Sequence, residues 1–167
     1  MLKENMKKLS VLFLIFTVML PSISWGLSMD DLVKRDGLWY KKFTDIPFTG
    51  KIDEGIDRGS INNGKAQGSW VIYFGDGQLK RKVNFKDGNL HGSYVSYHDN
   101  GQLFLKGNYE NGKQEGYWER YYPNGQSSDK GVFKNSKKEG YWEGFLKDGT
   151  VWRDDTGTFK NGVKVSD

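Results

Sequence analysis

The sequence predicts an all-β protein, an elongated antiparallel β-meander or solenoid built from stacked hairpin repeats. Three observations support this prediction. A Gly-and-aromatic motif recurs with a period of 24 residues, Asn-Gly and Asp-Gly pairs recur between the aromatic segments, and no apolar helical spacing persists beyond residue 26. The composition agrees, because 6 Trp, 9 Tyr and 10 Phe argue against disorder and 22 Gly interrupt the chain at short intervals.

Four copies of the repeat each begin with a glycine that is followed two residues later by a large aromatic residue. These starts are Gly68-Ser69-Trp70, Gly92-Ser93-Tyr94, Gly116-Tyr117-Trp118 and Gly140-Tyr141-Trp142. A second aromatic column keeps the same period at Tyr73, Tyr97, Tyr121 and Phe145. Each copy is therefore predicted to contain two short strands and two tight turns.

The turns are marked by Asn-Gly and Asp-Gly pairs, such as Asn100-Gly101 and Asn111-Gly112. Such pairs favour the type I′ turn, in which both central residues have positive φ. In the last copy Phe159 and Asn161-Gly162 arrive two residues late, which we attribute to an insertion or bulge near Asp154-Asp155.

The spacing between the two aromatic columns leaves two arrangements open. The columns are three residues apart, and a regular strand places such residues on opposite faces of the sheet. One column would then be buried by stacking and the other presented to a partner. Alternatively, a bulge between the columns returns both to one face.

The repeat array is predicted to span residues 59–165, followed by a short tail at 166–167. It begins with a half-repeat, because residues 59–64 lie one period before residues 83–88. Residues 27–58 are out of phase with the period and are interpreted as an N-terminal cap, which a repeat array needs to protect its terminal strand.

Residues 1–26 are predicted to form a secretory signal peptide. Three lysines lie among the first eight residues and precede an apolar run at 11–20, which is followed by small residues. The run is about half the ~20 residues that a membrane-spanning helix needs. We expect cleavage after Ser24 or after Gly26, and hence a periplasmic or secreted protein.

Charge and composition exclude several classes of function. Of the net charge of +4, +2 lies in the predicted signal peptide, and the remaining charges of both signs are mixed, so we expect no nucleic-acid partner. The absence of cysteine excludes disulfides, thiolate nucleophiles and thiolate metal sites. No Gly-x-Ser-x-Gly motif is present, and we expect neither an enzyme nor a bound cofactor.

We also expect no metal site. His91 and His98 are the only histidines, and no further ligands recur with them, so both are interpreted as exposed side chains. The aspartates beside turn glycines are explained by turn chemistry; they are Asp76, Asp87, Asp99 and Asp148.

The repeat unit resembles the MORN repeat variant of bacterial proteins grouped with the YwqK-type antitoxins. Residues 92–115 display it best, as GSYVSYHDNGQLFLKGNYENGKQE. In that family a G-x-[WY]-x-x-[YF] strand leads into an N-G-Q-L turn, supplied here by Asn100-Gly101-Gln102-Leu103, and G-x-[YF]-x-[ND]-G-K closes the unit. The resemblance covers roughly residues 59–165 and implies stacked hairpins that act by binding another molecule, without a catalytic centre.

A predicted signal peptide would separate the chain from a cytoplasmic toxin. The resemblance therefore implies either an immunity-like protein against an envelope toxin or a binding module unrelated to toxins. We expect a protein partner, and place the candidate binding surface where aromatic residues are densest, at Trp118, Tyr121, Tyr122, Trp142 and Phe145. A cell-wall or glycan ligand and a membrane surface are the alternatives, and self-association stays open.

Overall fold

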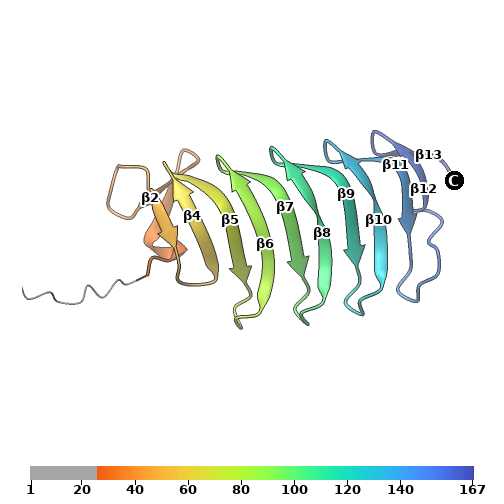
Figure 1. Ribbon diagram of the computed structural model, residues 1–167, viewed down its shortest axis with the longest axis horizontal. Helices are drawn as coiled ribbons and strands as arrows, with labels where there is room; N and C mark the ends of the chain where they lie inside the picture. The colour runs from red at the N-terminus through yellow and green to blue at the C-terminus, as the bar shows by residue number, and fades with distance from the viewer. Residues whose placement is uncertain (1–25) are drawn as a thin grey trace, which may run out of the picture.

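The computed structural model describes residues 26–167 and shows them as a long row of bowed strands (Figure 1). The predicted signal peptide lies outside the described residues, apart from Gly26. The elements are the 3-10 turn η1 (Met29–Asp31) and the strands β1 (Leu32–Arg35), β2 (Leu38–Lys41), β3 (Gly50–Ile52), β4 (Asp57–Asn62), β5 (Lys65–Tyr73), β6 (Leu79–Lys86), β7 (Asn89–Tyr97), β8 (Leu103–Glu110), β9 (Lys113–Tyr121), β10 (Ser127–Lys134), β11 (Lys137–Gly144), β12 (Gly157–Lys160) and β13 (Val163–Ser166).

Eleven strands, β3 to β13, form one sheet in strict chain order, and β1 pairs with β2 in a separate hairpin. Every pair of neighbours is antiparallel and consecutive in the sequence, as in β5–β6 and β6–β7. The predicted all-β meander of stacked hairpins is thus confirmed.

The turns along the upper edge in Figure 1 are two-residue hairpin turns. Their flanking residues pair directly, as Lys86 does with Asn89. Both central residues have positive φ, as type I′ requires; the pairs are Asn63-Gly64, Asp87-Gly88, Asn111-Gly112, Asn135-Ser136 and Asn161-Gly162. The predicted type I′ turns are confirmed at this edge.

The turns along the lower edge differ from the type I′ prediction. In the first three copies five residues, such as 74–78, separate the strands, and of these five only Gly77 has positive φ. The preceding side chain holds the turn instead, because the Oδ1 atom of Asp76 accepts the N–H of Gln78 at 2.9 Å. Asn100, Asn124 and Asp148 do the same in later copies.

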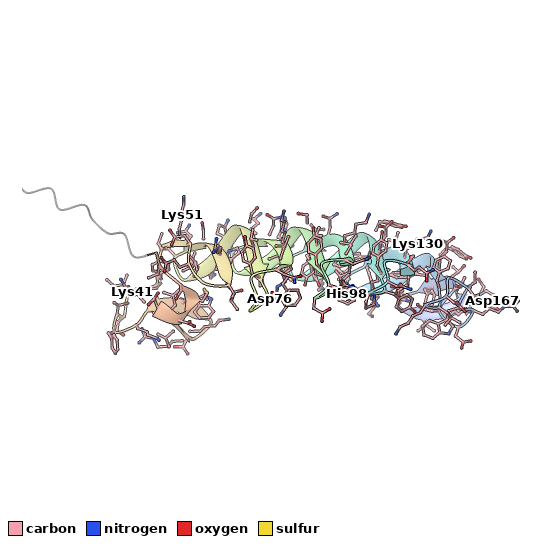
Figure 2. All side chains as sticks on the ribbon, turned by 90° about the horizontal axis from the view of Figure 1, so that it is seen from below. Lys41, Lys51, Asp76, His98, Lys130 and Asp167 are labelled. Atoms are coloured by element: carbon pink, nitrogen blue, oxygen red, sulfur yellow. The ribbon has the colours of Figure 1, made fainter. Side chains whose placement is uncertain are left out.

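The two aromatic columns lie on opposite faces of the sheet, the first of the two arrangements considered. We call the face that carries Trp70, Tyr94, Trp118 and Trp142 the inner face, and its reverse the outer face. In the second column, the Tyr121 hydroxyl donates to Glu119, two residues earlier and therefore on the same outer face. Figure 2 shows Lys51 and Lys130 on one side of the sheet and Lys41, with the β1–β2 hairpin, on the other.

Bulges are present in both strands of a copy, but none adds a residue to the first strand between its two aromatic residues. In the first strand the extra residues come earlier, where residues 68–70 of β5 lie opposite Gly59 of β4. In the β5–β6 ladder Ile72 pairs with Arg81 and Tyr73 with Leu79, which leaves Lys80 unpaired. These bulges therefore do not return the second column to the inner face.

Each buried indole lies against a glycine of the preceding strand. Trp70, Trp118 and Trp142 are only 5%, 1% and 1% exposed. A Cβ added to the facing glycine would overlap the ring; these glycines are Gly59, Gly107 and Gly131. In the second copy the aromatic residue is the smaller Tyr94, and the equivalent preceding residue is Val83. The residue in one strand is thus matched in size to the ring in the next.

The aromatic rings also contact one another along the sheet. Ring centroids lie 6.1 Å apart for Tyr94–Trp118, 6.1 Å for Trp118–Phe133 and 4.8 Å for Phe133–Trp142. Tyr94 packs against both this cluster and an N-terminal cluster that includes Trp70. Burying each such side chain contributes about 1.5–3 kcal/mol, so aromatic packing supplies much of the core.

The inner face is covered at both ends of the sheet. The β1–β2 hairpin is attached by the N–H of Trp39, which donates to the Gly64 carbonyl at 2.8 Å. At the other end the connection between β11 and β12 turns at residues 153–155, where the sequence predicts an insertion. There Lys138 pairs with Asp155 at 2.5 Å, which fixes the connection to the inner face.

Substituting Gly131→Ala should destabilise the protein by about 1–3 kcal/mol, because the new Cβ overlaps the Trp142 ring and a packed core accommodates it poorly. Gly75→Ala is the matched control, since a Cβ there meets no atom within 4 Å and Gly75 does not have positive φ. Urea unfolding measures both variants. Equal stability of the two variants would contradict the packing described here.

Candidate functional site

The structure divides the five residues of the predicted binding surface among the two faces and the lower edge of the sheet. Trp118 and Trp142 are buried on the inner face, so their assignment to an exposed surface is wrong. Tyr121 and Phe145 lie on the outer face, where Lys130 lies 5.6 Å from the Phe145 ring. Tyr122 lies at the lower edge, and its hydroxyl donates to the Phe145 carbonyl at 2.8 Å.

Side chains at the lower edge connect successive repeats. The Nε2 atom of His98 lies 2.8 Å from the Tyr121 carbonyl oxygen, and its ring packs on Phe104 with centroids 4.8 Å apart. His91 and His98 are both half-buried, so the expectation that they are exposed is wrong. Because His98 and Tyr122 occupy equivalent positions and both reach a carbonyl of the next copy, Tyr122 has a structural role.

An exposed apolar stripe crosses three neighbouring strands on the outer face. Tyr117 on β9, Val132 on β10 and Tyr141 on β11 are 52%, 41% and 57% exposed. Tyr117 pairs directly with Val132 in the β9–β10 ladder. Together with Tyr121 and Phe145, these residues form what we call the outer patch.

The same positions in earlier copies are polar. Ser69 and Ser93 replace the two exposed tyrosines, and Asn84 lies between them. The Ser69 hydroxyl donates to Asn84 Oδ1 at 2.7 Å, and Asn84 Nδ2 donates to the Ser93 hydroxyl at 2.8 Å. The outer face therefore changes from a hydrogen-bonded polar ladder to an aromatic stripe between the second and third copies.

The sequence analysis did not select Tyr117 and Tyr141, although a signal for them is present. The residue after the repeat glycine is serine in the first two copies and tyrosine in the last two. A change from small and polar to large and aromatic at one repeat position indicates a local requirement that the repeat itself does not impose.

Ion pairs border the outer patch. Lys106 and Glu119 lie 2.5 Å apart, and Lys130 and Glu143 lie 2.7 Å apart. Hydrogen bonds from Lys106 and from the Tyr121 hydroxyl hold the pKa of Glu119 below its usual range. The hydrogen bond to Glu119 likewise raises the pKa of Lys106, so this border stays charged at neutral pH.

Burial raises the pKa of both patch tyrosines that lie beside Glu119, Tyr117 and Tyr121. Both phenols are therefore neutral hydrogen-bonding groups at neutral pH. The outer patch combines apolar rings, neutral hydroxyls and a charged border.

A second charged cluster lies on the inner face. Asp129 is 3% exposed, with Arg120 at 3.5 Å and Lys138 at 3.8 Å from its Oδ2 atom. Burial raises the pKa of Asp129, while the two cations oppose that shift. Because Lys138 also contacts Asp155 and lies 4.4 Å from the Trp142 ring, this cluster fixes the end of the sheet.

Within residues 26–167 there is no group of three or more His, Asp or Glu side chains that could hold a metal ion. No helix among these residues is long and apolar enough to cross a membrane. The outer patch is the surface feature in this part of the chain that best fits binding.

Three segments of the chain match the family model of the MORN repeat variant, at residues 66–87, 90–111 and 114–135. They coincide with the strand pairs β5–β6, β7–β8 and β9–β10, so one MORN unit is two strands joined by a lower turn. A search of curated proteins gives no match.

Among solved structures, the chain is similar to a chain in the crystal structure of accessory secretory proteins 1, 2 and 3 of Streptococcus pneumoniae, with 18% identity and a TM-score of 0.36. The alignment covers 76% of this chain but only 23% of that one.

Replacing Glu119 by glutamine tests the border of the outer patch through its pH dependence. Because the folded pKa of Glu119 is lowered, its interactions stabilise the protein above the ordinary glutamate value of 4.5, and this stabilisation is lost as the pH falls through the folded value. The wild type should be more stable than Glu119→Gln by about 0.2–1 kcal/mol at pH 7, and the difference should shrink in acid.

Urea unfolding at several pH values measures this difference. Glu110→Gln is the matched control, because Glu110 is exposed on the neighbouring strand β8 and lies outside these ion pairs. A difference between wild type and Glu119→Gln that stays constant from neutral to acidic pH would disprove the role assigned to Glu119.

Proposed function

We propose that this MORN-repeat chain is an exported, non-enzymatic protein that binds a protein partner through the outer patch. One observation carries the proposal: Tyr117, Val132 and Tyr141 form an exposed apolar stripe, and residues 26–167 contain no other cluster of exposed aromatic side chains on neighbouring strands. Exposed apolar patches with polar borders are typical of protein interaction sites.

The arrangement of the patch favours a protein over other ligands. Tyrosine is enriched at protein interfaces, where it supplies apolar area and a hydroxyl at low entropic cost. The ion pairs Lys106–Glu119 and Lys130–Glu143 lie beside the tyrosines and provide charges of both signs, as the rim of such an interface does. A surface that binds an anionic membrane would instead carry a cluster of lysines and arginines without acidic partners.

The start of the described chain is compatible with export. The N–H of Leu27 donates to Asp53 Oδ1 at 3.0 Å, and the N–H of Gly26 donates to Glu54 Oε1 at 3.0 Å. Cleavage after Gly26 would give Leu27 a positively charged amino group beside Asp53. Export itself rests on the apolar run at 11–20 and the small residues after it.

An immunity role is the narrower form of the proposal. It rests on the resemblance of the repeat unit to the YwqK-type antitoxins and on the predicted signal peptide, which together favour a toxin that acts in the envelope. In this form the outer patch would cover the active surface of the toxin. Co-expression with a candidate toxin, scored by growth, tests this form separately from binding.

Replacing Tyr117 or Tyr141 by the serine of the first two copies should weaken partner binding without unfolding the protein. Affinity capture from cross-linked envelope extract identifies the partner, and calorimetry then measures its affinity for wild type, Tyr117→Ser and Tyr141→Ser. Each substitution removes a central interface tyrosine and should cost about 2 kcal/mol, or roughly a thirtyfold loss of affinity.

Phe43→Ser is the matched control, because Phe43 is fully exposed on the connection between β2 and β3. It should bind as the wild type does. Undiminished affinity of both tyrosine variants would refute the outer patch as the binding surface, and capture of wall fragments alone would favour a glycan ligand instead.

A further inference from the structure

A cavity of about 260 Å³ lies between the β1–β2 hairpin and the inner face of β5 and β6. Trp39 of the hairpin lines one side, and Trp70, Ile72 and Phe85 of the sheet line the other. Figure 1 shows β2 crossing the N-terminal end of the sheet near β4. The cavity thus exists because the hairpin and the sheet meet without filling the space between them.

The polar side chains around the cavity are mostly cationic. Lys34, Lys65 and Arg81 line it, against one carboxylate, that of Asp57. Within residues 26–167 Arg81 forms no ion pair. Its Nε atom is buried and has no hydrogen-bond acceptor. A buried donor without an acceptor costs free energy. The Nε–H group of Arg81 would therefore be stabilised by a ligand that supplies an acceptor.

The repeat does not require an arginine at this position. Arg81 pairs with Ser96 in the β6–β7 ladder, and the Ser96 hydroxyl is also buried without a partner. The equivalent residues of later copies are Leu105 and Asp129, and Asp129 has its own cations within 4 Å. The first two copies therefore place two unpaired donors opposite each other, and one of them, Arg81, lines the cavity.

Arg81 also borders a second cavity of about 190 Å³, which shares Ile72 and Phe85 with the first and extends to Tyr94 and Tyr109. The guanidinium group thus lies between two apolar spaces on the inner face. A ligand whose charged end meets Arg81 can place its apolar part against the aromatic rings on either side.

We propose that this cavity binds a small organic carboxylate with an apolar body. A guanidinium group binds a carboxylate through two parallel charge-assisted hydrogen bonds, and Trp70 and Phe85 supply the apolar walls. The volume lies just below the ~300–1,000 Å³ of pockets for drug-sized ligands, which favours a medium-chain fatty acid or an arylalkanoic acid. The site is on the inner face and does not depend on the outer patch.

Calorimetric titration of the whole protein with decanoate and with 4-phenylbutanoate tests the proposal, and decan-1-ol is the uncharged control. At least one of the two acids should bind saturably at one site, and decanol should bind at least tenfold more weakly. Arg81→Gln should lower the affinity for the acid at least tenfold. Lys82→Gln should leave it unchanged, since Lys82 is the next residue of β6 and lies on the outer face.

Ala66→Leu keeps every charge and fills part of the cavity, so it should weaken binding even where Arg81→Gln fails to fold. A shift of the Arg81 Nε–H resonance on titration provides a second readout that reports the guanidinium group directly. The proposal is overturned if neither acid binds saturably, if decanol binds as well as the acid, or if the Arg81→Gln or Ala66→Leu protein binds with wild-type affinity.

Discussion

The contact between a tryptophan ring and a glycine of the preceding strand holds the sheet together. Between the β1–β2 hairpin and the β11–β12 connection, the described chain places no second layer of secondary structure over the inner face. The apolar area of this face must therefore be buried by its own side chains. A glycine such as Gly107 lets the Trp118 ring lie directly on the backbone, which removes more apolar area from water than a ring standing on a side chain would.

This packing leaves the outer face free to change from copy to copy. Adjacent residues of a strand point to opposite faces, so the residue next to Trp118 can vary without altering the aromatic core. The chain uses this freedom at Tyr117 and Tyr141, where the first two copies have serine. The sheet is thus stabilised on one face, while the other face carries the surface proposed to recognise a partner.

Much of the fold could be predicted from the sequence because the 24-residue period and the type I′ turns are local signals. The assignment of faces could not, since the sequence shows neither whether a bulge lies between the two aromatic columns nor which of the two faces is buried. Trp118 and Trp142 were therefore placed on an exposed surface, although they are buried. Density of aromatic residues along a chain does not say which face they occupy.

The two candidate sites differ in how far the sequence reveals them. The serine-to-tyrosine change at position 117 is visible in the aligned copies and needs no structure. Arg81 gives no such signal, because its environment is made by the β1–β2 hairpin, which lies outside the period. Contacts between the cap and the array follow from tertiary packing, and the repeat pattern does not contain them.

A double-mutant cycle at Gly107 and Trp118 tests the central claim most directly. The second copy already has the alternative pair Val83 and Tyr94 at these positions, so Gly107→Val, Trp118→Tyr and the double variant reproduce a pairing that this fold accepts. Trp118→Tyr also breaks no hydrogen bond, because the Trp118 Nε1 atom has no partner. Urea unfolding should show that the double variant is more stable than the sum of the two single effects predicts, by about 0.5–3 kcal/mol. Additive effects would contradict the claim that each ring and the residue beneath it are matched in size.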